Sequence, residues 1–332
     1  MTELLLVGGQ NSDKYKKGEA WGAYQAGVVA TVNLQSGNMK VLVKDDSRPE
    51  FLSGLAEIGT VFKAASLTKD HLIVPSTTEV IFFNRKTWKE EGRISSTWFN
   101  DLHHVIPYRS KSLLVVNTGL DCIMEVDLKG ELLNKYCVCA EESSRVFDDD
   151  VDYRRVVSTK PHIAHPNHVF YCNSHLYATR FKQKDAICLT DKTRSSFQIR
   201  VGNVHDGLVV NGLVYFTSTN GWVTSFDIET GSQKMQMDLN SIFRADRPLG
   251  WCRGIQVLDN GDLVVGFSRL RPTKFRENVD WIAKGVGFKK KLSPLPTRIA
   301  VVDPKDRVVK FEIDIEAIGM NAIFSIHVDK FS

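Results

Sequence analysis

One local pattern recurs along the chain: an apolar strand, a turn, a second apolar strand, another turn, and an alternating strand that closes on Asp and then Gly. The clearest copy spans residues 103–136, and a later one spans residues 207–237. The first strands of five copies align at steps of 39, 64, 39 and 47 residues, at Ala65, His104, His168, Gly207 and Gly254. A period near 40 residues with four strands per unit is typical of β-propeller blades.

The two ends of the sequence supply a sixth unit. Residues 4–8, 27–34 and 39–43 read as three strands that lack a first one, and residues 322–328 read as a strand without a blade. Joining them closes the ring and leaves no free sheet edge at the seam. We therefore predict an all-β fold, a six-bladed β-propeller whose first blade is closed by the C-terminal strand. It forms a single domain over residues 1–332, with insertions at about 139–166 and 271–296. A seventh blade would require one insertion to hold a full unit.

The composition and the distribution of apolar residues limit the kinds of binding partner that we expect. The chain has 43 Lys and Arg against 39 Asp and Glu, a formal charge of +4, which argues against a nucleic-acid binder. No run approaches the roughly 18 apolar residues of a membrane span, and the first residues lack a signal-peptide pattern. The six cysteines lie in apolar, strand-like segments without a C-x-x-C motif, so we expect buried free thiols and a reducing cytoplasm. We expect a cytoplasmic monomer with a small-molecule substrate and neither a nucleic-acid nor a membrane partner.

Two consecutive blades carry a resemblance. The segment 165–177, with sequence HPNHVFYCNSHLY, resembles the signature between the first two strands of the gluconolactonase and senescence marker protein (SMP-30) propellers, which are related to NHL-repeat propellers. The following blade, from His205 to Gly231, is similar to the Pro-Asp-Gly blade of that group. The resemblance implies an axial divalent cation held by an Asn, an Asp and a Glu, with the Asp also acting as a proton-transfer base. Asn167 and Asp206 match the Asn and the Asp. The Glu has no match, and Asn321 stands in its expected place as a neutral, weaker ligand.

Histidines gather just before the first strands. They are His103 and His104, His165 and His168, and His205, with Arg253 at the equivalent point of the next blade. In a propeller these junctions converge on one end of the central channel. Strand alternation sends only one member of the first pair to the axis, and alignment with Asn167 selects His103. Imidazoles suit zinc, iron or manganese better than calcium. We therefore predict a divalent metal (zinc, iron, manganese or calcium) whose ligands are His103, Asn167, Asp206 and Asn321.

The remaining polar residues complete the predicted site. We assign Asp206 as the base, and proton-shuttle roles to His104, His168 and His205. Arginines at the same face could clamp a carboxylate or phosphate, namely Arg253, Arg269 and Arg271.

The function predicted from these residues is a metal-dependent hydrolase or lyase, similar to a lactonase, acting on a small, oxygenated, anionic metabolite. The chain lacks a P-loop, a G-x-G-x-x-G fingerprint, a G-x-S-x-G elbow and an H-E-x-x-H motif, which argues against the common nucleotide-binding and serine-hydrolase chemistries. Two interpretations of the histidines stay open beside the metal, a metal-free polar pocket and a purely structural role. The alternative function is a non-catalytic NHL-type propeller that binds a protein or peptide on one face.

Overall fold

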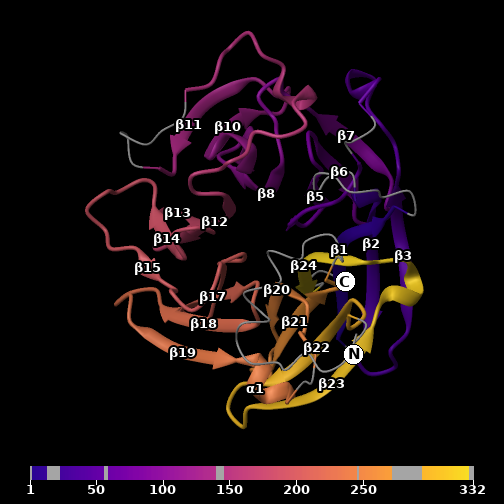
Figure 1. Cartoon of the computed structure of the whole chain (residues 1–332), viewed down its shortest axis with the longest axis vertical. Coiled ribbons are helices and arrows are strands. Elements are labelled where there is room, and N and C mark those ends of the chain that lie inside the picture. The colour runs from indigo at the N-terminus through magenta and orange to yellow at the C-terminus, as the bar shows by residue number, and fades with distance from the viewer. Residues whose placement is uncertain are drawn as a thin grey trace.

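The computed structural model describes residues 2–12, 23–55, 59–139, 146–244, 247–270 and 294–328. These residues form six antiparallel sheets of four strands each. Figure 1 shows the sheets arranged around a common centre. The predicted six-bladed β-propeller is confirmed.

We number the blades in chain order, from the first one whose four strands are consecutive. Blade 1 contains β4 (Ser66–Leu67), β5 (His71–Pro75), β6 (Val80–Asn84) and β7 (Glu90–Ile94). Blade 2 contains β8 (Leu102–Tyr108), β9 (Ser112–Asn117), β10 (Cys122–Asp127) and β11 (Leu132–Cys137). Blade 3 contains β12 (Pro166–Cys172), β13 (His175–Arg180), β14 (Asp185–Cys188) and β15 (Phe197–Gln198). Blade 4 contains β16 (Leu208–Val210), β17 (Leu213–Ser218), β18 (Trp222–Asp227) and β19 (Gln233–Asp238).

Blade 5 contains β20 (Trp251–Val257), β21 (Leu263–Ser268), β22 (Arg298–Asp303) and β23 (Val308–Asp314). Blade 6 contains β24 (Ala322–Val328), β1 (Glu3–Asn11), β2 (Tyr24–Asn33) and β3 (Met39–Asp45), in that spatial order. The pairing of β24 with β1 runs from Leu4 opposite Val328 to Gly9 opposite Ala322. Both ends of the described chain therefore share one sheet, as predicted, and they lie close together in Figure 1.

Packing between the blades follows from strand alternation. Along β9, Leu113 and Val115 face the cluster shared with blade 1, whereas Leu114 and Val116 face the cluster shared with blade 3. Successive side chains of a strand point to opposite faces, so a continuous apolar run buries both faces of a sheet. Each pair of neighbouring blades shares such a cluster, including blades 5 and 6 and blades 6 and 1. The ring is thus closed by apolar packing as well as by β24.

Several hairpin connections within the blades are short. A two-residue turn joins β16 to β17, where Asn211 and Gly212 have φ angles of 51° and 74°, as the Asn-Gly pair predicts. Helical segments are few in the described residues: α1 (Leu239–Phe243) and the 3₁₀ turns η2 (Glu50–Leu52), η3 (Thr118–Leu120), η5 (Tyr153–Arg155) and η6 (Glu316–Ile318). Among the helices described, none has the length and apolar character needed to cross a membrane.

The first predicted insertion lies between β11 and β12 and folds back on the ring. Tyr153 stacks on Trp98, with ring centroids 5.8 Å apart, and belongs to the cluster between blades 1 and 2. The amide of Asn100 donates hydrogen bonds to the carbonyls of Tyr153 and Val156, each at 2.8 Å. Most of the second insertion, with Arg271, lies outside the described residues.

Candidate functional site

Irregularities in the inner strands bring polar residues to the propeller axis. The register shifts by one residue near the start of β8, β12, β20 and β24. A bulge leaves the extra residue outside the ladder and re-aims its side chain. The residues at these shifts are His103, Asn167 with His168, Arg253 with Gly254, and Phe324.

His103 lies in a buried polar network with Lys63 and Asp101. Asp101 Oδ1 is 3.3 Å from Lys63 Nζ and 3.4 Å from His103 Nε2, and Lys63 Nζ is 3.5 Å from His103 Nε2. All three side chains are at least nine-tenths buried. Asp101 has a φ of 47°, a left-handed conformation that is costly for a residue with a side chain. The fold therefore holds a strained carboxylate against a lysine and an imidazole.

A second pair of imidazoles approaches from the first insertion. His162 Nδ1 and His165 Nδ1 are 2.7 Å apart, and the His165 ring centroid lies 5.2 Å from that of His103. The backbone of residues 163–165 donates three hydrogen bonds to the carboxylate of Asp121, at 2.7 to 3.0 Å. His165 itself has a φ of 55°. Asp121 thus fixes a strained loop that carries His165 next to His103.

His205 and Asp206 come from the entrance to blade 4. His205 Nδ1 is 3.5 Å from Asp206 Oδ1, and the His205 ring centroid is 6.0 Å from that of His103. The other oxygen, Asp206 Oδ2, accepts hydrogen bonds from Thr217 Oγ1 and from the backbone N of Gly254, the latter at 2.9 Å. Asp206, predicted as the base, therefore links blade 4 to blade 5 and orients His205.

Two cations flank an aromatic ring at the closing strand. Lys63 Nζ and Arg253 Cζ each lie 4.9 Å from the centroid of Phe324. Arg253 Cζ also lies 4.7 Å from the Trp251 ring. Cations over aromatic faces are attracted by the ring quadrupole, and a guanidinium held by its faces donates hydrogen bonds in its plane. This geometry suits the predicted role of Arg253 as an anion clamp.

His104 and His168 form a separate layer. Their rings stack with centroids 3.6 Å apart, and His104 Nδ1 accepts a hydrogen bond from Val169 N at 3.2 Å. His104 is thus occupied in the contact between blades 2 and 3, whereas His103 joins the axial network, as alternation predicts. His327, which we had no reason to single out from the sequence, donates to or accepts from Ser325 Oγ at 3.0 Å on β24.

Burial keeps these imidazoles neutral. Burial, together with the nearby Lys63 ammonium, lowers the pKa of His103 to about 3. Burial lowers the pKa of His168 to about 4, and it lowers the pKa of His205 in spite of Asp206. Burial raises the pKa of Asp101, but the Lys63 ammonium and the hydrogen bond from His103 outweigh it and hold that pKa well below its usual value. At neutral pH the axis therefore combines uncharged imidazoles with two carboxylates and two cations.

The structure places two other predicted residues away from this network. The amide oxygen of Asn321 accepts a hydrogen bond from Asn11 N at 2.9 Å, and Phe324 holds the register position equivalent to His103. The alignment of the sequence repeat had placed Asn321, three residues earlier, at that position. Arg269 donates hydrogen bonds to both carboxylate oxygens of Glu316, with Nε at 2.6 Å from Oε1, which ties β21 to η6. Arg271 lies outside the described residues.

The donors at the axis do not fit a resident divalent cation. Within the described ranges, no three or more His, Cys, Asp or Glu side chains are grouped so that they could hold a metal ion. Asn321 is turned to Asn11, one oxygen of Asp206 already accepts two hydrogen bonds, and Lys63 is within 3.5 Å of His103. A fixed ammonium beside a ligand opposes a metal cation electrostatically. The metal site inferred from the sequence therefore remains a prediction.

Several axial atoms lack partners instead. Within the described part of the chain, four buried polar atoms of this region make no hydrogen bond: His103 Nδ1, Asn167 Oδ1, His168 Nδ1 and His205 Nε2. Buried polar groups are hydrogen-bonded in the great majority of cases, and exceptions call for an explanation. The unpartnered atoms of His103, Asn167 and His205 make the axis a candidate site for a polar ligand.

Sequence reasoning missed Lys63, Asp101, His162 and Phe324. Lys63 and Asp101 lie two and three residues before the aligned positions Ala65 and His104, and lysine is rarely buried. His162 is inside an insertion, where no repeat gives it a place. The strand pattern itself could have indicated Phe324. Residues 322–328 are predicted to be the inner strand of the closing blade, so the first residues of that strand are expected near the axis.

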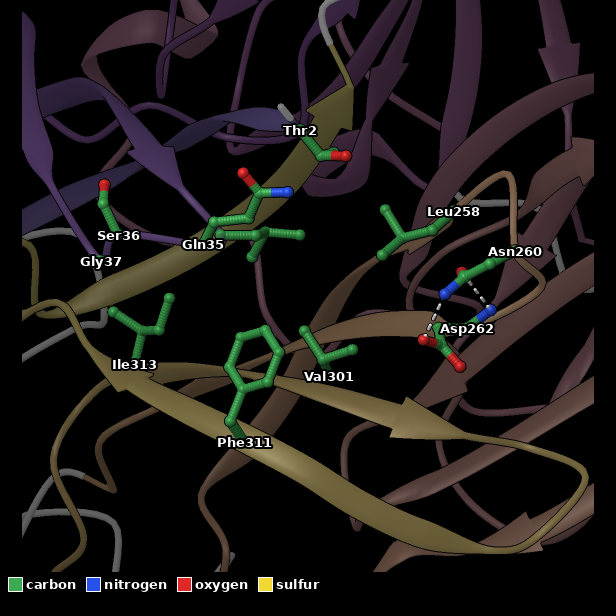
Figure 2. Close-up of a pocket in the computed structure, with 11 residues that line it drawn as sticks. Thr2, Gln35, Ser36, Gly37, Leu258, Asn260, Asp262, Val301, Phe311 and Ile313 are labelled. Carbon is green, nitrogen blue, oxygen red and sulfur yellow. Dashed lines mark hydrogen bonds between the residues drawn. The ribbon is translucent and has the colours of Figure 1, made fainter.

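A shallow groove lies elsewhere, between blades 5 and 6 (Figure 2). It has a volume of about 590 Å³, and its lining is mainly apolar, with Leu258, Val301 and Phe311. Its carboxylate, Asp262, is hydrogen-bonded to Asn260 and to Lys310. The groove contains neither histidine nor cysteine. The axis, which concentrates strained residues and unpartnered polar atoms, is therefore the better candidate site.

Comparison with known proteins supports the fold alone. No family model matches the chain, and no curated protein matches it. A protein of unknown function from Bacteroides caccae is similar over 99% of this chain and 100% of its own, with a TM-score of 0.61 and 13% identity. A chain of a nidogen/laminin complex is similar over 99% of both, with a TM-score of 0.59 and 7% identity. A streptogramin B lyase is similar over 95% of this chain and 88% of its own, with a TM-score of 0.50 and 9% identity.

Proposed function

We propose that the protein is an enzyme of the hydrolase or lyase type that binds a small, oxygenated, anionic metabolite on the propeller axis. One observation carries this proposal: buried, unpartnered atoms of His103, Asn167 and His205 lie in the same region as the cations of Lys63 and Arg253. Structural needs alone do not explain such a cluster, because an unpaired buried polar group costs roughly 1–3 kcal/mol.

The cations supply the binding energy for an anion. Arg253 lies against Trp251 and Phe324, and Lys63 reaches the same Phe324 ring. A guanidinium in a fixed orientation matches the two oxygens of a carboxylate or the oxygens of a phosphate. The anion would sit near these side chains, with its oxygenated carbon skeleton toward the imidazoles.

His205 is the best-placed group for proton transfer. When its Nδ1–H faces Asp206, the opposite nitrogen, Nε2, keeps a lone pair, and Nε2 is the atom without a partner. Such a nitrogen can take a proton from a carbon beside a carbonyl group, as in a lyase, or from water, as in a hydrolase. The role of Asp206 is then to hold the tautomer and orientation of His205.

Calorimetry tests this proposal directly. Wild-type protein is titrated with a panel of small carboxylates, sugar acids, lactones and phosphate esters. We expect at least one anionic class to bind with a Kd of about 1 mM or tighter, and Arg253→Gln to weaken that binding at least roughly tenfold, which corresponds to about 1.4 kcal/mol. Arg194→Gln, which removes an exposed guanidinium near Asp191, is the matched control and should bind as wild type.

Two results would overturn it. If no class binds, the non-catalytic alternative becomes the better account of the axial residues. If Arg253→Gln binds as tightly as wild type, the anion is bound elsewhere. Elemental analysis of the dialysed protein decides the separate metal prediction: zinc, iron, manganese or calcium at one atom per chain, lost in Asp206→Asn, would contradict the metal-free form of the proposal.

A further inference from the structure

Lys63 stands apart from the other lysines. Its side chain is 8% exposed, and no other lysine of the described residues is buried. Long cationic side chains normally keep the charged end in water, so a buried ammonium at the axis calls for a reason.

The surroundings of Lys63 are those of a reactive amine. Asp101 Oδ1 lies 3.3 Å from Nζ and His103 Nε2 lies 3.5 Å from it, and the Arg253 guanidinium lies on the same Phe324 ring as Nζ, each 4.9 Å from its centroid. Desolvation and a neighbouring cation are the two devices by which proteins turn lysine into a nucleophile.

We propose that Lys63 forms an imine with the carbonyl group of a small keto or aldehyde acid bound at the axial site. This assignment rests on the proposed function and names its substrate class: Arg253 takes the carboxylate, and Lys63 takes the carbonyl carbon.

The step balances without another reagent. Nζ of Lys63 forms a bond to the carbonyl carbon while one ammonium proton passes, through the adjacent Asp101 carboxylate, to the carbonyl oxygen. The C=O π electrons move to oxygen, which collects that proton and a second one from nitrogen. The C–O bond then breaks and water leaves. Lysine ammonium and carbonyl compound thus become protonated imine and water, with one positive charge on each side, which Asp101 offsets.

Reductive trapping provides the test. The full chain is incubated at pH 7 with glyoxylate and cyanoborohydride, which reduces the imine to a stable secondary amine, and the modified peptides are mapped by mass spectrometry. We expect the occupancy of Lys63 to be at least roughly tenfold higher than that of exposed lysines such as Lys234. Acetaldehyde, which lacks the carboxylate, should lose this preference.

Two variants sharpen the result. Lys63→Arg keeps the charge beside Asp101 and should abolish axial labelling, while labelling of exposed lysines is unchanged. Arg253→Gln should lower the labelling of Lys63 alone. Labelling confined to exposed lysines in the wild type would overturn the inference, and this measurement does not depend on the folding of any variant. If calorimetry still shows an anion bound through Arg253, only the imine falls; if it shows none, the proposed function falls as well.

Discussion

The interfaces between neighbouring blades differ from the axis of the ring in the kind of side chain that is buried. Between blades, side chains such as Leu114 and Phe216 are fully buried and apolar, and the backbone is satisfied by regular ladders. At the axis, His103, Asp101 and Lys63 are equally buried but polar, and some of their neighbours lack partners. The first region accounts for the stability of the fold. The second costs stability, which is the usual mark of a site kept for function.

The largest expected effect is the loss of stability in acid. A histidine whose pKa is lower in the folded than in the unfolded state resists protonation when folded, so stability is complete above the unfolded pKa of about 6.5 and falls as the pH drops toward the folded pKa. With pKa values of about 3 for His103 and about 4 for His168 and His327, each loses roughly 1.5 kcal/mol between pH 6.5 and 5.

Urea denaturation at each pH measures this effect, and the three histidines together predict a loss of roughly 4–5 kcal/mol. His103→Asn should flatten the dependence by about one proton. The lowered pKa values of Asp101 and Asp206 act only below their unfolded value of about 3.9, outside this window. A flat profile between pH 6.5 and 5 would contradict the burial of neutral imidazoles at the axis.

A truncation between blades comes next. Phe216 is fully buried in the cluster that joins blades 3 and 4, beside Phe170 and Phe226. Phe216→Ala should lower the free energy of unfolding by about 3–5 kcal/mol, since it removes an aromatic ring and leaves a cavity. Anion binding measured well below the melting temperature should be unchanged. A large loss of binding would show that the two regions are not separable.

The link between blades 4 and 5 should show an intermediate effect. Asp206→Asn replaces one acceptor oxygen by a donor and disturbs the bonds from Thr217 and Gly254, so we expect a loss of about 1–3 kcal/mol. Asp227→Asn is the matched control, because Asp227 accepts backbone hydrogen bonds in an exposed turn that Asn also forms. It should change stability by less than about 0.5 kcal/mol. Thermal denaturation of the two variants would refute the assignment if it ranked them the other way.

The smallest effect is expected at the outer turns. Gly212 has a φ of 74° with no atom close to the position of an added Cβ, so Gly212→Ala should cost about 1 kcal/mol from backbone strain alone. Gly92 on β7 lacks a positive φ and has room beside Phe82, and Gly92→Ala should be neutral or slightly stabilising. Equal effects of the two substitutions in chemical denaturation would show that the turn does not impose its conformation.

The repeat was enough to predict the blades and their closure, because each unit needs its own apolar strands and the unpaired strand at residues 322–328 had one place to go. Alternation also predicted which of His103 and His104 reaches the axis. The axial position on the closing strand was not predictable: it falls on Phe324, three residues after Asn321, and no pattern in residues 321–324 marks it. Lys63 and His162 could not be predicted as site residues, because the position of a buried lysine and of a histidine in an insertion is set by contacts with residues distant in sequence.

The pairing of β24 with β1 has a consequence for the order in which the protein matures on the ribosome. Phe324, which both Lys63 and Arg253 contact, lies on β24, which is synthesised after all the other described strands of the propeller. A nascent chain in which blades 1 to 5 have been synthesised still lacks β24, so its ring is not closed and one side of the axial site is missing. The contacts of Lys63 and Arg253 with Phe324 therefore form late in biosynthesis, and a chain cut short before residue 322 would expose the unpaired edge of β1 to intermolecular sheet pairing.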